Sequence, residues 1–548
     1  MAAKIGRSIA RSNSRHLRDL DTSHGTKNLW RSVNNLTKVK GATQPSSQVT
    51  AEELNAHYAS TSTDIEYVPP SLRLTAAHNV PMVSEPEIFR ALDQLRHTTA
   101  GHDQLPAWFL RLLAPICSHS LTYIVNLSLQ QSCVPSQWKT AIIHPAPKVP
   151  SPSTPADYRP ISVVPILSRI VERFIVHAFI YTAFHRPPIA EKIKDQFAFR
   201  PTGSTTAAVI DLLQQISTML QTNEYVAIIH VDYSKAFDTV GHSSLMLKMC
   251  TIDLPDQIYN WVVNYFNQRG HITSHRGIMS SLAMINASVI QGSVLGPPSF
   301  IVEASDLHPL YTFNALMKYA DDSYLLVGSR HISTVTEEFD HIIHWAGENN
   351  LRLNPLKTKE LIVSRRGGHG RSQPPTSAII SGAERVDSLR VLGVVITHDL
   401  STTAHLDQVL SSCASSIYAL RVLRSHGLCP HLLHRVAKTT TVASLMYASP
   451  AWWGFSSARD RARIEQLINK LKRSGFLPQS APAALDLALD ADARLFRAVI
   501  TDPGHVLHKH LPEARQINYN LRPRAHEFRL PLKDDRNFIP RLLFKDMY

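Results

Sequence analysis

The sequence predicts an α+β protein of several subdomains, with a strand-rich middle part and a helical C-terminal part. Residues 226–231 are apolar on both faces except for one histidine, which indicates a central, fully buried strand. From Ser84 onward apolar residues recur at helical spacing, and beyond about residue 400 the regular patterns are helical. A chain of 548 residues is too long for one compact core, so several subdomains are expected.

The first half of the chain begins with a polar and basic segment, residues 1–84, which we expect to be loosely structured. A proline-rich loop that contains Lys148 separates the first predicted strand from the helix that follows it. Ser204 is suited to cap a later helix. The predicted elements of this half are helices over 88–95, 108–113, 121–129, 166–184 and 207–220, and a strand over 141–143.

Three polar features interrupt the apolar patterns of the middle part. The strand 226–231 delivers Asp232 at its C-terminal end, where an α/β sheet exposes functional side chains. Asp321 and Asp322 lie between two apolar runs, which predicts a β-hairpin whose turn carries both acids. The glycine-flanked segment 291–298 precedes an apolar helix. Later predicted elements are helices through 339–345 and 459–474 and strands over 360–363 and 389–396.

The charge of the chain favours a polyanionic partner. There are 57 Lys and Arg against 44 Asp and Glu, a net charge of +13, while the 44% hydrophobic content excludes a disordered protein. The excess of basic residues lies in two segments. Residues 1–42 contain nine basic and two acidic residues, and residues 421–473 contain ten basic and two acidic residues. Such segments suit a polymer-binding protein, although basic tails are often simply solvated.

The cysteine and hydropathy patterns point to an intracellular protein outside the membrane. The five cysteines show no CxxC pair, and Cys429, His431 and His434 lack a second pair of ligands, so we predict no zinc site. The most apolar stretch, 161–184, is interrupted by charges, and the N-terminus has no secretory signal. The acid-free residues 1–18 resemble a transit peptide weakly, and a basic nucleic-acid arm explains them equally well.

The paired acids acquire a function only if Asp232 and Asp321 meet. A lone Asp-Asp pair is usually an exposed turn. If the two strands are neighbours, two or three carboxylates would converge on Mg²⁺, which prefers oxygen ligands and leaves positions open for substrate phosphates. Two such ions clamp the attacking and leaving oxygens of a phosphoryl transfer. A basic protein with this site could extend a nucleic acid.

Three segments occur in the order and spacing of reverse-transcriptase motifs: Val231-Asp232-Tyr233-Ser234-Lys235-Ala236-Phe237-Asp238, Gln291-Gly292-Ser293-Val294-Leu295-Gly296-Pro297 and Tyr319-Ala320-Asp321-Asp322. From about residue 85 the chain resembles the reverse transcriptase of a non-LTR (LINE-type) retrotransposon. Any one motif is weak, whereas the ordered set is highly specific. Further matching segments are 138–148, 158–162, 196–200, 353–359 and 392–394.

The resemblance implies a right-hand polymerase with fingers, a palm built on an antiparallel sheet with helices, and a helical thumb. It would extend a DNA primer 3′-end on an RNA template with dNTPs, by two-metal nucleotidyl transfer during retrotransposition. The expected cofactor is two Mg²⁺ ions, with Mn²⁺ as an alternative. The expected divisions are a basic connector at 1–84, fingers at 85–225, palm at 226–400, thumb at 401–480 and a C-terminal extension at 481–548.

The resemblance also assigns roles to individual residues. Asp232 and Asp321 would be catalytic metal ligands, and Asp322 a weaker or second-metal ligand. Phe237 would exclude a 2′-hydroxyl and so select dNTPs, although a core phenylalanine at a helix start is the alternative. Further residues that the resemblance implies contact the nucleotide are Lys148, Arg159, Gln291 and Gly292. Either Lys357 or Lys359 would also contact it, as the proton donor to pyrophosphate. Arg200 and Gly393 would contact template and primer.

The sequence departs from the family pattern at four positions. Ile290 stands where proline commonly precedes the Gln-Gly pair, and Ala198 stands for glycine. Pro298 and Ser299 replace bulkier apolar residues. A catalytically silent RNA-binding relic with the same fold is therefore the alternative function, and a viral RNA-dependent RNA polymerase is disfavoured by Phe237.

The family's upstream endonuclease has no counterpart before residue 85, so a separate endonuclease is an expected partner. The expected location is the nucleus and cytoplasm, as a ribonucleoprotein.

Overall fold

The computed structural model describes residues 49–73, 82–354, 357–364, 375, 378–515 and 526–545. Its centre is a five-stranded sheet in the order β10-β9-β3-β8-β7. Strand β3 is antiparallel to both β8 and β9, and β7 and β8 form a hairpin. The strands are β3 (Tyr225–Val231), β7 (Ala315–Tyr319), β8 (Asp322–Gly328), β9 (Lys359–Ser364) and β10 (Glu384–Arg385).

Strand β3 is the buried central strand that its sequence predicts. Ala227, Ile229 and Val231 pack into one hydrophobic cluster, which extends toward the N-terminal half of the chain. Val226 and Ile228 pack into a second cluster, which extends into the C-terminal helices. Because side chains alternate along a strand, one strand joins the two cores of the protein.

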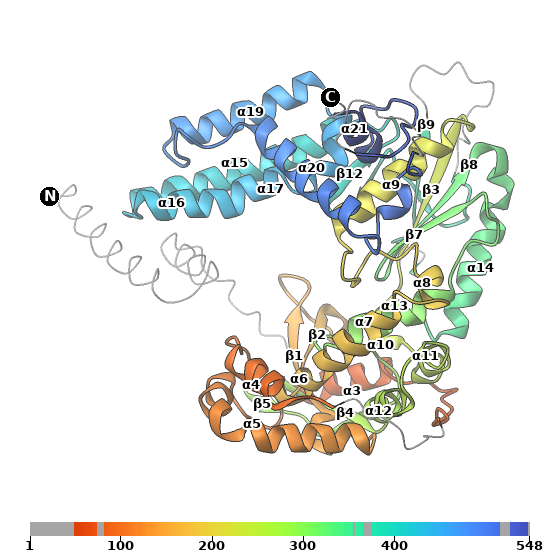
Figure 1. Cartoon of the computed structure of the whole chain (residues 1–548), viewed down its shortest axis with the longest axis vertical. Coiled ribbons are helices and arrows are strands. Elements are labelled where there is room, and N and C mark those ends of the chain that lie inside the picture. The colour runs from red at the N-terminus through yellow and green to blue at the C-terminus, as the bar shows by residue number, and fades with distance from the viewer. Residues whose placement is uncertain are drawn as a thin grey trace.

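A second sheet, in the order β2-β1-β4-β5 with β6 paired to β4, forms the lower arm of an open C shape (Figure 1). Helix α5 runs through Pro115 as one helix, so the prediction of two separate helices there is wrong. The predicted helix over 166–184 is confirmed, with a π-helical turn, η3, inside it. The elements of this half are β1 (Thr140–Pro147), β2 (Tyr158–Val163), β4 (Arg269–His275), β5 (Ile278–Met279), β6 (Ala283–Ile285), α4 (Glu85–Asp93), α5 (Ala107–Gln130), α6 (Ile166–Ile175), η3 (Val176–Ile180), α7 (Tyr181–Ala183), α8 (Ile189–Lys192), α9 (Thr205–Met219), α10 (Ala236–Thr239), α11 (His242–Met249), α12 (Asp256–Phe266), α13 (Gly296–Glu303) and α14 (Val335–Glu348).

The expectation of a loosely structured segment over 1–84 is wrong for α3 (Ala51–Thr61). This helix starts with a capping box between Thr50 and Glu53. The buried Asn55 side chain accepts hydrogen bonds from His271 Nδ1 (2.8 Å) and Thr273 Oγ1 (2.9 Å) of β4. Helix α3 is thus part of the packed lower arm. Residues 1–48 and 74–81 lie outside the described residues.

The C-terminal part is helical, as predicted, and forms the upper arm (Figure 1). The predicted strand over 389–396 is instead a hairpin of β11 (Ser388–Val391) and β12 (Val394–Thr397), because Gly393 turns the chain with a φ of 91°. The main helices are α15 (Thr403–Ser425), α16 (Pro430–Ala437), α18 (Ser449–Trp452), α19 (Ala458–Arg473), α20 (Ala484–Thr501) and α21 (Phe538–Lys545).

Helix α5 is the one helix of the described residues that is long and apolar enough to cross a membrane. About a third of the most apolar 18-residue stretch of this helix is buried inside the protein. Length and composition are weak evidence, because core helices of soluble proteins meet the same criteria.

Replacing Ile228 with alanine is expected to lower the free energy of unfolding by about 2–5 kcal/mol, because it leaves a cavity in the second cluster. The midpoint of urea unfolding measures the change. Leu112→Ala on α5 is the control, because that side chain is 67% exposed and its loss should change stability by less than about 0.5 kcal/mol. Equal shifts for the two variants would contradict the assignment of β3 to the core.

Candidate active site

The pairing of β3 with β8 brings the predicted acids together. Val231 lies opposite Ser323, so Asp232, which follows β3, lies beside the turn that carries Asp321 and Asp322. That turn bends at Ala320, whose φ is 56°. Burial raises the pKa of Asp321 to about 6, and the neighbouring carboxylates of Asp322 and Asp232 add to the rise. The three carboxylates therefore repel one another, as expected where a cation belongs.

The three acids differ in their surroundings. Asp232 and Asp321 line one cavity of about 540 Å³, whereas Asp322 does not. Asp322 Oδ1 lies 3.2 Å from Nε2 of His230, whose ring stacks on Tyr324 with centroids 4.8 Å apart. Asp322 is thus held by the sheet beside the cavity, and Asp232 and Asp321 are the two carboxylates that face a bound molecule.

These two carboxylates fit magnesium by donor chemistry. Mg²⁺ commonly takes one or two carboxylates and completes its shell with water and substrate phosphates. Within the described residues, no group of three His, Cys, Asp or Glu side chains is arranged to hold a metal by itself. The ammonium of Lys357 lies 3.2 Å from Asp232 Oδ2 and neutralises part of the site. The residues therefore suit an ion that arrives with a phosphate ligand.

Basic side chains line the same cavity. Lys148 and Arg159 come from the hairpin of β1 and β2, and Lys357 comes from the segment before β9. The Lys148 ammonium donates to the carbonyl of Ala156 at 2.8 Å, which holds it at the mouth of the hairpin. Anionic metal ligands and fixed cations thus share one cavity.

The segment 291–298 forms another part of the cavity wall. Gln291 lines the cavity, and its Nε2 donates to Asp238 Oδ1 at 2.8 Å, which orients the side-chain amide. Burial raises the pKa of Asp238 to about 6. Gly292 has a φ of 117°, and a Cβ there would lie 2.3 Å from the carbonyl oxygen of Ser162, so glycine is required.

The buried carboxylate of Glu172 holds the same segment from behind. It accepts hydrogen bonds from the backbone N–H groups of Val294 (2.7 Å) and Leu295 (3.1 Å). Helix α6, which carries Glu172, therefore fixes the position of the wall that contains Gln291.

Besides Asp322 and Gly292, which lie next to lining residues in the sequence, four of the predicted residues do not line the cavity. Phe237 stacks on Phe300, with ring centroids 4.6 Å apart, and its packing fits a core phenylalanine as well as a gate. Lys359 pairs with Glu384 at 3.3 Å, so Lys357 is the lysine of the two that lies at the cavity. Arg200 donates to the carbonyl of Ile193, and Gly393 lies in the turn between β11 and β12.

The motifs did not reveal the contribution of α3 to the cavity. Tyr58 and Thr61 line it, and the Lys235 ammonium lies 2.8 Å from His57 Nε2 and 3.2 Å from Thr61 Oγ1. The capping box at Thr50 was the sequence signal that could have identified this helix.

Residues 146–396 match the model of a family described as reverse transcriptase (RNA-dependent DNA polymerase). The RNA-directed DNA polymerase from mobile element jockey of Drosophila melanogaster is 30% identical over 324 residues, which cover 56% of this chain and 34% of that protein. A relative described as "Probable RNA-directed DNA polymerase from transposon X-element", from the same species, is 25% identical over 399 residues. These residues cover 69% of this chain and 42% of that protein. The chain thus spans less than half the length of these relatives.

Among solved structures, apo telomerase from Candida tropicalis is similar over 65% of this chain and 67% of its own. The sequence identity is 12% and the TM-score is 0.36, a likeness too slight to support an argument. The family match covers all three motif segments, from Val231 to Asp322. Residues 146–396 are therefore similar to the reverse transcriptase family, and the resemblance of the chain to the RNA-directed DNA polymerases of non-LTR retrotransposons is confirmed.

Proposed function

We propose that this chain is an active RNA-directed DNA polymerase, which extends a primer 3′-end on an RNA template with two Mg²⁺ ions. The observation that carries the proposal is one cavity in which Asp232 and Asp321 face Lys148, Arg159 and Lys357. A metal-binding pair of carboxylates opposite fixed cations is the arrangement that a nucleoside triphosphate requires. Mn²⁺ could replace Mg²⁺ with the same oxygen ligands.

In the proposed reaction, the primer 3′-oxygen bonds to the α-phosphorus of the dNTP as the bond to the bridging oxygen breaks and pyrophosphate leaves. Asp232 and Asp321 would hold Mg²⁺, which when bound supplies positive charge that makes the 3′-hydroxyl more acidic, so that its proton passes to water, and that offsets the developing negative charge. Lys148 and Arg159 would hold the triphosphate. Lys357 would give a proton to the leaving pyrophosphate, since it reaches the carboxylate of Asp232 in the same cavity.

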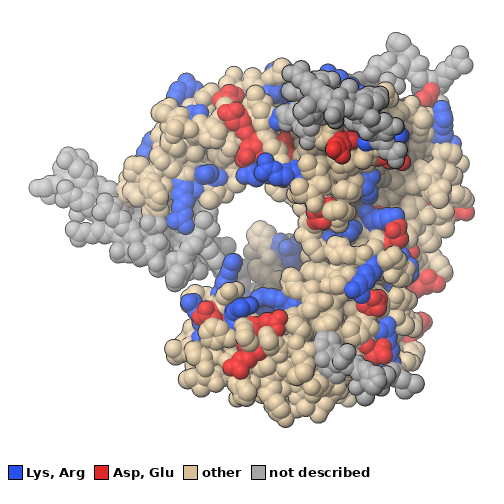
Figure 2. All heavy atoms as spheres, viewed as in Figure 1, with Lys and Arg blue, Asp and Glu red and all other residues tan. Residues whose placement is uncertain are grey.

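An RNA template, a DNA primer and dNTPs are the proposed partners. Lys and Arg side chains lie around the opening between the two arms (Figure 2), where a polyanion would pass. A separate endonuclease would supply the nicked primer end, and a ribonucleoprotein of nucleus and cytoplasm is the proposed setting.

Replacing Asp321 with asparagine should lower primer extension about a thousandfold, because it removes a metal ligand that lines the cavity. Asp322→Asn should cost only about tenfold, since that carboxylate lies outside the cavity lining. Gel analysis of a labelled primer on an RNA template, with dNTPs and Mg²⁺, measures both variants against wild type. Wild-type protein without product, or undiminished product from Asp321→Asn, favours the catalytically silent RNA-binding relic.

Replacing Phe237 with valine should raise incorporation of rNTPs relative to dNTPs about tenfold or more, if the ring blocks the 2′-hydroxyl. The measurement is the ratio of kcat/KM values for the two nucleotides. Phe300→Val is the matched control, because it disrupts the same ring stack from the partner side. If both variants keep the wild-type ratio, Phe237 is a packing residue and not a gate.

Asp238→Asn should stabilise the protein increasingly from about pH 4 to about pH 6, and by a constant amount above that range. Because the pKa of Asp238 is higher in the folded than in the unfolded protein, the folded protein binds more protons between about pH 4 and pH 6. The stability of the wild type therefore falls as pH rises through this range, and the Asp238→Asn variant avoids this loss. A rise from 3.8 to about 6 corresponds to about 3 kcal/mol. Urea unfolding in metal-free buffer at several pH values measures the difference, with exposed Asp93→Asn as control. A stability difference that does not change with pH would contradict the burial of Asp238.

A further inference from the structure

A second, basic cleft lies between the lower arm and the C-terminal extension. Its volume is about 310 Å³. More than half of its lining residues are basic, and none is acidic. We call it the basic cleft, and define it by His185, Lys194, Arg200, His505, His508 and Lys509.

Buried contacts hold the C-terminal side of the basic cleft in place. Asp211 of α9 is fully buried, and its Oδ1 lies 2.9 Å from Lys509 Nζ and 2.6 Å from His510 Nε2. The Thr202 hydroxyl accepts a hydrogen bond from the N–H of Val506 at 3.2 Å. Because a buried carboxylate must keep its partners, these contacts fix the segment 502–510 against α9 and the residues that precede it.

Several donors of the basic cleft remain free for a ligand. The Arg200 guanidinium donates through Nη1 to the carbonyl of Ile193 at 2.9 Å, and its other N–H groups have no hydrogen-bond partner among the described residues. His505 Nδ1 accepts from the N–H of Leu507, so the neutral ring carries its proton on Nε2. Lys194 is largely exposed and pairs with Glu191 of α8, a surface pair that binds its partner weakly. A guanidinium, an imidazole N–H and an ammonium together match the oxygens of a phosphate.

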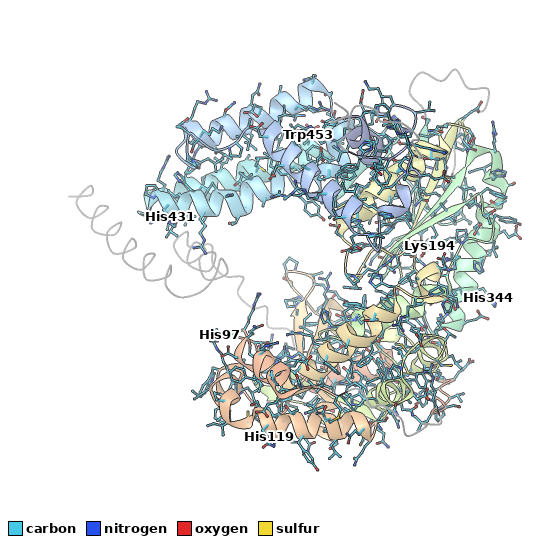
Figure 3. The ribbon with its side chains drawn as sticks, in the orientation of Figure 1. His97, His119, Lys194, His344, His431 and Trp453 are labelled. Atoms are coloured by element: carbon cyan, nitrogen blue, oxygen red, sulfur yellow. The ribbon has the colours of Figure 1, made fainter. Side chains whose placement is uncertain are left out.

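The basic cleft is linked to the catalytic turn by hydrogen bonds. The N–H of Phe197 donates to the carbonyl of Lys318 at 2.9 Å. The side-chain oxygen of Gln196 accepts from the N–H of Ala320, directly before Asp321, at 3.0 Å. Lys194 lies near the closed end of the opening between the arms (Figure 3). Buried residues thus join the segment that carries Lys194 and Arg200 to the turn before Asp321, and the cleft opens near the end of the space between the arms.

We propose that the basic cleft binds the phosphodiester backbone of the single-stranded part of the RNA template. The inference rests on the proposed polymerase function, and it gives the C-terminal extension a share in template binding through His505, His508 and Lys509. Each phosphate contact displaces a counterion, so binding here depends on salt.

The test measures binding of two fluorescent primer–template hybrids at several salt concentrations, without Mg²⁺. In one hybrid the RNA template ends flush with the DNA primer, and in the other it extends by about 12 nucleotides. Wild type should bind the extended hybrid more tightly. Lys194→Ala and Arg200→Gln should each weaken only that hybrid, about threefold to tenfold, and lower its salt slope by about 0.7. Lys194→Arg should restore binding.

Lys192→Ala is the matched control, because Lys192 ends α8 shortly before Lys194 but lines a different cleft, with Trp345 and Glu348. Equal losses for Lys192→Ala and Lys194→Ala, or equal losses on both hybrids, would overturn the proposal. Wild-type binding of inorganic phosphate with no preference for the extended hybrid would assign the cleft to free phosphate and also overturn it. Failure of primer extension with the preference intact would reject the polymerase function instead.

Discussion

The antiparallel pairing of β3 with β8 is the constraint on which the rest of the site depends. A strand register is set by which side chains can be buried, and a slip of one residue would turn Ile228 and Ile229 to the opposite faces. The same register places Asp232 opposite the turn with Asp321. Hydrophobic burial therefore stabilises the position of two carboxylates that repel each other, and the cations of Lys148, Arg159 and Lys357 surround them.

The outer walls of the cavity depend on interactions made at a distance from the carboxylates. The buried carboxylate of Glu172 accepts hydrogen bonds from the Ser168 hydroxyl and from two backbone N–H groups of the segment after Gln291, which fixes the wall that carries Gln291. The close approach of Gly292 to Ser162 joins that wall to β2. A site built on such backbone contacts can hold a nucleotide without any change in the sheet.

Much of the fold and of the site could be predicted from the sequence, because both rest on local patterns. The alternation and length of apolar runs identified β3 and the β7–β8 hairpin, and spacing identified α19. The pairing of strands far apart along the chain came only through the motif resemblance, since periodicity does not reveal neighbours. The choice between Lys357 and Lys359 required the structure, because Lys357 lies before β9 and reaches Asp232, whereas Lys359 begins β9 and pairs with Glu384. Helix α3 was missed since its polar surface masks the few residues that it buries.

The attachment of α3 has a consequence for how the protein folds during synthesis. Asn55 is separated by 216 residues from His271, the partner that satisfies its side chain. Helix α3 leaves the ribosome long before β4 and β6 exist, so it must wait unpaired while more than a third of the chain is made. The cavity therefore closes late, because α3 can complete its wall only after β4 and β6 have been made.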